Sequence, residues 1–173
     1  MPDLSTNCAG IRSPNPFWLA SAPPANSGAQ VQRAFDAGWG GAVWKTLGVP
    51  IQNVSSRFGA LNYSGTRAIG FNNIELITDR PLEVNFREIY ETKKKFPKHA
   101  VVVSLMVETQ EEWKDIIKRS IDAGADGLEL NFGCPHGMCE RGMGSAVGQE
   151  PMVDERITAW AVEYSTVPVL VKL

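Results

Sequence analysis

The residues best suited to chemistry lie between positions 131 and 144, where the sequence is Asn-Phe-Gly-Cys-Pro-His-Gly-Met-Cys-Glu-Arg-Gly-Met-Gly. Cys134 lies three residues beyond Asn131, which ends an apolar strand pattern, and a thiol at such a position can donate or accept a proton. The glycines around it allow a ligand to approach the backbone closely. We interpret Cys134 as a catalytic acid rather than as a small buried apolar group. His136 has two interpretations of equal weight. It either acts on Cys134 or a substrate, or makes a structural hydrogen bond.

A metal site is the alternative for Cys134, His136 and Cys139. An iron–sulfur cluster usually needs four cysteines, whereas this chain has 3. Zinc accepts three protein ligands in an open site, but the spacing matches no common zinc motif. We therefore expect no metal ligands here. The odd number of cysteines also argues against a disulfide framework and favours a reducing, cytoplasmic location.

Two lysines, Lys45 and Lys172, each end an otherwise apolar strand pattern. An ammonium group is costly to bury unless an anionic or electron-rich partner receives it. One interpretation is structural ion pairing with carboxylates such as Glu129. The other adds the hydroxyls of Ser21 and Thr46 and predicts a cofactor that accumulates negative charge, as a reduced flavin does at its N1–C2 carbonyl edge.

These residues require a framework of alternating strands and helices. The predicted strands are 17–21, 42–46, 100–105, 127–131 and 168–173. Strands that alternate with helices form right-handed crossovers and a parallel sheet. Both a doubly wound sheet and a (β/α)8 barrel fit this order, but no Gly-x-Gly-x-x-Gly turn follows the first strand, and polar residues end nearly every strand. We therefore predict an α/β fold comprising the first five strands of a barrel, with residues 1–173 as the N-terminal part of a larger barrel domain.

Helix signals separate the strands. Ser27 is a candidate N-cap, Pro81 suits a first turn, and Thr109 with Glu112 has the pattern of a capping box. The predicted inward stripe of the helix after Pro81 includes Tyr90. The long polar connection 48–78 predicts a functional loop or a small hairpin.

Composition narrows the function classes. The chain has 173 residues, of which 43% are hydrophobic and 21% charged, and its net charge is −2. Such a balance provides no strong field for nucleic acid or an anionic membrane. No run of about 18 apolar residues is present, and the first residues lack the pattern of a secretory signal, so we expect a cytoplasmic protein.

Several segments together resemble a known family. They are residues 15–22, Lys45-Thr46, residues 73–77 and residues 131–144. In these segments the chain resembles the FMN barrel of the dihydropyrimidine dehydrogenases, within the dihydroorotate dehydrogenase superfamily. The resemblance extends from about residue 4 to residue 173. It is strongest to the bacterial two-subunit form, because the barrel pattern begins near Met1.

The resemblance implies a role for individual residues. Ser21, Lys45, Thr46 and Lys172 match positions that bind FMN. Asn73 and Asn131 match asparagines that bind the pyrimidine, with Phe132 and Gly133 adjoining them, and Cys134 matches the acid that protonates the ring. Cys139 departs from the family, which usually has glycine there.

The implied activity is reduction of the C5=C6 bond of uracil or thymine in pyrimidine catabolism. FMN would deliver hydride to C6 and Cys134 a proton to C5, with electrons from NAD(P)H through a flavoprotein and iron–sulfur partner subunit. The resemblance also implies iron–sulfur clusters in a further C-terminal part, and an oligomer. Dihydroorotate dehydrogenase is one alternative, although its loop continues differently after Cys134-Pro135. The other alternative is a partial barrel without catalytic activity, because five strands cannot close.

Overall fold

A parallel sheet forms the centre of the molecule. The computed structural model describes residues 2–49, 58–71, 76–135 and 139–173. Within these ranges the sheet contains five strands, β3 (Trp18–Leu19), β4 (Gly41–Leu47), β7 (Ala100–Leu105), β8 (Gly127–Asn131) and β9 (Val169–Lys172). Their order in the sheet follows their order in the chain. A doubly wound sheet reverses its strand order at a switch point, so the uninterrupted order confirms the predicted part of a (β/α)8 barrel.

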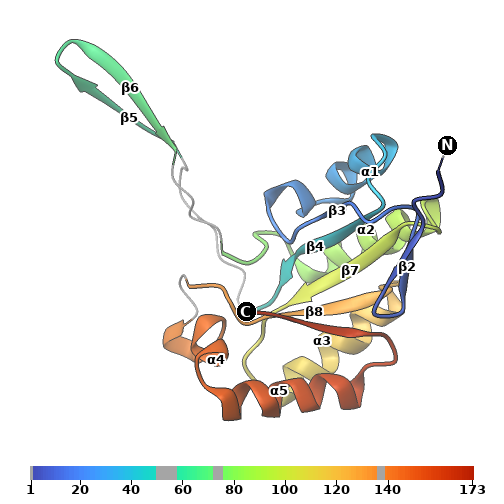
Figure 1. Ribbon diagram of the computed structural model, residues 1–173. Helices are drawn as coiled ribbons and strands as arrows, with labels where there is room; N and C mark the ends of the chain where they lie inside the picture. The colour runs from blue at the N-terminus through green and yellow to red at the C-terminus, as the bar shows by residue number, and fades with distance from the viewer. Residues whose placement is uncertain (1, 50–57, 72–75, 136–138) are drawn as a thin grey trace.

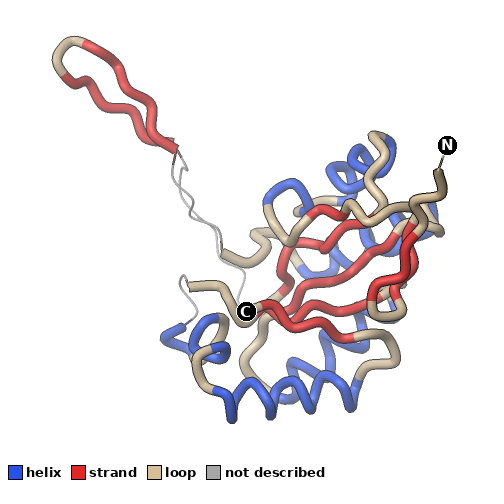
Figure 2. The backbone as a smooth tube through the Cα atoms, viewed as in Figure 1, coloured by secondary structure: helices blue, strands red, loops and turns tan. Residues whose placement is uncertain are grey.

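Four helices connect these strands and cover one face of the sheet (Figures 1 and 2). They are α1 (Gly28–Asp36), α2 (Leu82–Lys95), α3 (Gln110–Asp122) and α5 (Pro151–Tyr164). The predicted caps are confirmed, because Ser27 accepts from the Gln30 amide and Thr109 and Glu112 form a capping box. Pro81 is the N-cap of α2 rather than part of its first turn. Short helical turns that were not predicted are η1 (Pro23–Ala25), η2 (Cys139–Arg141) and α4 (Ser145–Gly148).

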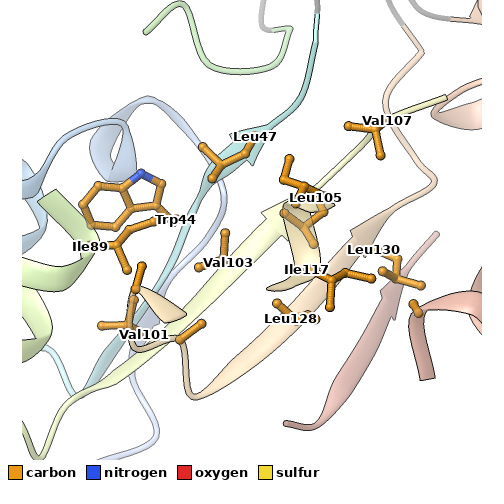
Figure 3. Close-up of a cluster of buried hydrophobic side chains, with 14 of the residues drawn as sticks. Trp44, Leu47, Ile89, Val101, Val103, Leu105, Val107, Ile117, Leu128 and Leu130 are labelled. Carbon is orange, nitrogen blue, oxygen red and sulfur yellow. The ribbon is translucent and has the colours of Figure 1, made fainter. Parts of the chain in front are cut away.

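The main core lies between the sheet and these helices (Figure 3). Trp44, Leu105 and Leu128 lie on the helix-facing side of the sheet and are fully buried, as is Ile117 of α3. The Trp44 indole nitrogen donates to Asn85 Oδ1 at 3.0 Å, which fixes α2 against β4. Tyr90 is 55% exposed, so the prediction that it faces inward was wrong. The buried stripe of α2 runs through Phe86 and Ile89, and position 90 lies about 100° further around the helix.

A small antiparallel hairpin closes the other face of the sheet at the amino ends of its strands. It consists of β1 (Thr6–Cys8) and β2 (Ile11–Ser13), neither of which was predicted. Ile11 packs against Ala100 and Val102. A Cβ atom at Gly127 would lie 2.4 Å from Ile11 Cδ1, so Ile11 occupies the space beside this glycine. We call this contact region the floor of the sheet.

A second hairpin confirms the prediction for the connection 48–78. Its strands are β5 (Phe58–Tyr63) and β6 (Thr66–Phe71), and Figure 1 shows it standing away from the sheet. Residues 50–57 and 72–75 of this connection lie outside the described residues. None of the described helices is both long enough and apolar enough to cross a membrane.

Candidate active site

The inner face of the sheet is divided into two layers. Near the floor the layer is apolar, with Trp18, Val43, Val102 and Leu170 around Ile11. Alternate residues of a strand point to the same face. Two residues further along these strands, at their carboxyl ends, the side chains on the inner face are polar. They are Lys45, Ser104 and Lys172, with Glu129 and Asn131 on β8. In a barrel the carboxyl ends of the strands form the rim where active sites are built.

An irregularity in β4 places two consecutive side chains in the polar layer. The pairing of β4 with β7 shifts register between Trp44 and Leu47, both of which are buried in the main core. An extra residue in a strand interrupts the normal alternation of side chains. Lys45 and Thr46 therefore both lie on the inner side, with exposed fractions of 4% and 2%.

A buried hydrogen-bond network joins three adjacent strands. Thr46 Oγ1 lies 2.9 Å from Ser104 Oγ, and Asn131 Nδ2 donates to Thr46 Oγ1, also at 2.9 Å. Asn131 Oδ1 accepts from the Gly133 amide at 3.4 Å. All three side chains are buried, so the network fixes which way the Asn131 amide is turned. We call Thr46, Ser104 and Asn131 the hydroxyl–amide network.

A second cluster joins β8, β9 and Ser21, which lies two residues beyond the end of β3. Lys172 Nζ donates to Ser21 Oγ at 2.8 Å and lies 3.1 Å from Glu129 Oε1. Ser21 Oγ donates to the same carboxylate oxygen at 2.7 Å. We call Ser21, Glu129 and Lys172 the charged triad. Lys172 thus forms the expected ion pair with Glu129 and also contacts Ser21, a predicted cofactor-binding residue.

The remaining lysine of the polar layer lies against the chain that returns from the second hairpin. Lys45 Nζ donates to the Leu76 carbonyl at 3.1 Å. The ammonium is thereby held at the rim. Asn73 itself lies outside the described residues.

Cys134 is partly buried at the rim, on the loop that follows β8. Its side chain packs against Ile77, Met106 and Met143, and its carbonyl accepts from the Ser145 amide at 3.0 Å. Gly144 has φ of 60° and ψ of −129°, and a Cβ atom there would lie 2.4 Å from Cys134 O. The loop therefore holds Cys134 by its backbone as well as by its side chain.

The two residues between Asn131 and Cys134 contribute differently. Phe132 is buried, and its ring packs against Trp113 with centroids 6.5 Å apart, so its side chain belongs to the core beneath α3. Gly133 is exposed at the rim. Only backbone groups of Phe132 can therefore face the polar layer. A Cβ atom at Gly133 would lie 3.1 Å from the Leu173 carbonyl carbon, so the chain at 133 packs closely against the end of β9.

Other candidates are only partly described. His136 and the side chain of Cys139 lie outside the described residues. Among the residues whose positions are described, no three His, Cys, Asp or Glu side chains gather as metal ligands would. Sequence reasoning named Glu129 only as a possible ion-pair partner of the lysines and gave Ser104 no role in the site. Their inward parity on the strands was the available signal, since a polar side chain there faces the rim.

The arrangement combines two ammonium groups, a fixed amide and a thiol at one rim, and such a set can hold an electron-rich ring and donate a proton to it. The family model for dihydroorotate dehydrogenase matches residues 3–173. The chain belongs to this family. The family assignment confirms the resemblance found in the sequence and agrees with the strand order of the sheet.

Two relatives in the family are dihydropyrimidine dehydrogenases. The NADP(+) enzyme of Arabidopsis thaliana chloroplasts is 40% identical over 181 residues, covering 99% of this chain and 42% of its own length. The NAD-dependent dihydropyrimidine dehydrogenase subunit PreA of Escherichia coli K12 is 40% identical over 172 residues, with the same coverage of both chains. This chain thus spans less than half the length of either relative.

A third relative is the catalytic subunit of dihydroorotate dehydrogenase B (NAD(+)) from Thermoplasma acidophilum. It is 31% identical over 175 residues, covering 100% of this chain and 55% of its own length. Identity is therefore higher to the two dihydropyrimidine dehydrogenases than to this dihydroorotate dehydrogenase.

Proposed function

We propose that this chain provides five strands of the FMN-binding barrel of a dihydropyrimidine dehydrogenase. In this proposal the other strands belong to the part of the relatives' length that the chain does not cover. The observation that carries the proposal is the position of Cys134, one short loop beyond the buried Asn131 amide and at the rim that holds Lys45 and Lys172. The 40% identity to dihydropyrimidine dehydrogenases supports the same assignment.

The donor set of the polar layer fits FMN. Lys45 and Lys172 supply positive charge, and Ser21 and Thr46 supply hydroxyls. A reduced flavin gains negative charge at its N1–C2 carbonyl edge, and cations nearby stabilise that charge. In the proposal these four residues hold FMN, which when bound supplies hydride to C6 of uracil or thymine.

The other residues would bind the pyrimidine and manage its proton. The hydroxyl–amide network turns Asn131 so that its amide can hydrogen-bond a ring carbonyl or ring N–H, and Asn73 is its proposed second partner. A donor held in advance at a carbonyl stabilises the charge that develops there. Cys134 Sγ then gives its proton to C5. The apolar floor below the site excludes water from that side.

The same proposal assigns the electron supply to NAD(P)H, through a flavoprotein and iron–sulfur partner subunit. Iron–sulfur clusters would be carried outside this chain, and the assembly would be oligomeric. The printed name of the Escherichia coli relative as a subunit of an NAD-dependent enzyme supports a two-subunit arrangement.

The test is a comparison of substrates with the full-length protein and its partner subunit. We expect bound FMN and reduction of uracil and thymine with NADH or NADPH, with no turnover of orotate. Turnover of orotate without turnover of uracil would assign dihydroorotate dehydrogenase activity instead. FMN content without either activity would favour the partial barrel without catalysis.

A further inference from the structure

The charged triad contains a carboxylate that the proposed chemistry does not use. Glu129 Oε1 accepts from Ser21 at 2.7 Å and lies 3.1 Å from Lys172 Nζ. Its side chain is only 12% exposed, whereas that of Lys172 is 39% exposed. The carboxylate therefore lies deeper than the ammonium and holds it from below.

The contacts of the charged triad fix the position of the Lys172 ammonium more than they stabilise the fold. Desolvation of a partly buried ion pair offsets much of its Coulomb attraction, so the pair adds little to folding. Glu129 and Lys172, however, lie on the adjacent strands β8 and β9, and Ser21 forms hydrogen bonds with both of them. With both neighbours bonded to it, the Lys172 ammonium has one preferred position at the rim.

The triad also determines the local charge. A lysine beside a flavin favours the reduced form, because negative charge accumulates there on reduction. A carboxylate in contact with that lysine opposes this effect.

We propose that Glu129 is a positioning residue that fixes the Lys172 ammonium and offsets its charge, so that bound FMN is held less strongly in its reduced form. This inference rests on the proposed function, because it requires FMN beside Lys172. It makes Lys172 a positioned donor with little net charge.

The experiment measures how strongly the full-length protein binds oxidised FMN and FMN reduced with dithionite under anaerobic conditions. In Glu129→Gln, binding of reduced FMN should become about tenfold stronger relative to binding of oxidised FMN. This change in the ratio of dissociation constants is equivalent to about 30 mV for a two-electron couple. Glu129→Asp retains the charge and should restore most of the original ratio. Thermal unfolding midpoints are compared in parallel to separate the shift from a change in stability.

Asp122→Asn is the matched control, because Asp122 forms an exposed ion pair with Lys118 on α3 and lies outside the polar layer. It should leave the ratio unchanged. If Glu129→Gln does not fold, Lys172→Met serves as the second variant and should shift the ratio in the opposite direction.

If Glu129→Gln folds and binds FMN with an unchanged ratio of the two dissociation constants, this inference is overturned and the proposed function stays intact. An equal shift of the ratio in Asp122→Asn overturns it in the same way. If Lys172→Met is used instead, an unchanged ratio in that variant also overturns this inference and leaves the proposed function intact. Failure of the unmodified protein to bind FMN in either form overturns the proposed function, and this inference with it.

Discussion

Lys172 Nζ donates to Ser21 Oγ at 2.8 Å, although Lys172 lies on β9 and Ser21 two residues beyond the end of β3, the two outermost strands of the sheet. Neighbouring strands lie about 4.8 Å apart, so in a flat sheet these edges would be separated by roughly 19 Å. A lysine and a serine side chain cannot span that distance. The sheet must therefore curl so that its two edges approach across the inner face, as in part of a barrel.

Replacement of Cys134 tests the proposed proton donor. In the full-length enzyme, Cys134→Ala should keep FMN bound and reducible but lower uracil turnover by about 10²–10⁴-fold, the usual contribution of general acid catalysis. Cys134→Ser should fall between, because a hydroxyl is a weaker acid. Turnover is measured under saturating reductant with flavin content determined in parallel. Cys8→Ala, at an exposed cysteine on β1, is the control and should retain activity. Near-normal turnover in Cys134→Ala would remove Cys134 from the role.

Lys45→Met removes the buried charge but keeps most of the side-chain volume. A hydrogen bond to a charged group contributes about 1.5–3 kcal/mol, so FMN should bind roughly ten- to a hundred-fold more weakly. Equilibrium titration of the full-length apoprotein with FMN measures this. Lys94→Met, at an exposed position on α2, should bind FMN as the unmodified protein does. Equal affinity in both variants would return Lys45 to a purely structural role.

Ser104→Ala tests whether the hydroxyl–amide network orients Asn131. The loss of one buried hydrogen bond should lower the free energy of unfolding by about 1 kcal/mol. Because Thr46 then loses a partner, Asn131 should be held less firmly and KM for uracil should rise several-fold. Ser120→Ala is a matched control, since Ser120 is equally buried and donates to Ile116 O within α3. It should cost similar stability without changing KM, and a KM rise of the same size in Ser120→Ala would contradict the orienting role.

His99 should make the stability of the protein sensitive to pH. Partial burial, and secondarily the Lys93 ammonium, lower the pKa of His99 below its ordinary value of about 6.5, with Asp36 opposing. The folded protein thus binds this proton less tightly than the unfolded chain does. Stability from neutral His99 is present above pH of about 6.5 and is lost as the pH falls through the lowered pKa.

Urea unfolding of the full-length protein at pH 7.5 and 5.5 measures this effect, with His99→Phe as the comparison. The Phe35 and Phe96 rings lie 4.6 Å and 5.3 Å from the His99 ring, so a phenyl group suits the site. The variant should lose less stability between the two pH values. The pKa of Glu88, lowered by its hydrogen bond with Arg80, acts in the same direction but at more acidic pH. Equal losses in both proteins would exclude His99 as the source.

Much of the fold was predictable because strand and helix signals are local. The buried strands β7 and β8 have the predicted bounds. For β7, a nearly continuous apolar run between turns marks a strand covered on both faces. The floor hairpin was missed because its strands have only three residues each and depend on Ile11 contacting distant residues. For the long connection 48–78, the length predicted a functional loop or a small hairpin, and the structure has a hairpin there.

The candidate site was predictable in its parts but not in its pairing. Lys45 and Lys172 stood out as charges in apolar strands, yet the contact between Lys172 and Ser21 depends on how the sheet curls. Nothing local to the sequence reports that curvature. The inward turn of Thr46 likewise depends on the irregular pairing of β4 with β7, which propensities do not predict. The assigned roles of these residues stay predictions until tested.

The turn that closes the loop around Cys134 also sets the mutational tolerance of that loop. Gly142 and Gly144 both have positive φ, but among the described residues a Cβ atom at 142 would meet no atom within 4 Å. A residue such as asparagine, which accepts left-handed backbone, can therefore replace Gly142 at modest cost. Any side chain at 144 would collide with the Cys134 carbonyl itself. Substitutions can thus accumulate at Gly142 during evolution, whereas Gly144, two positions away, must remain glycine.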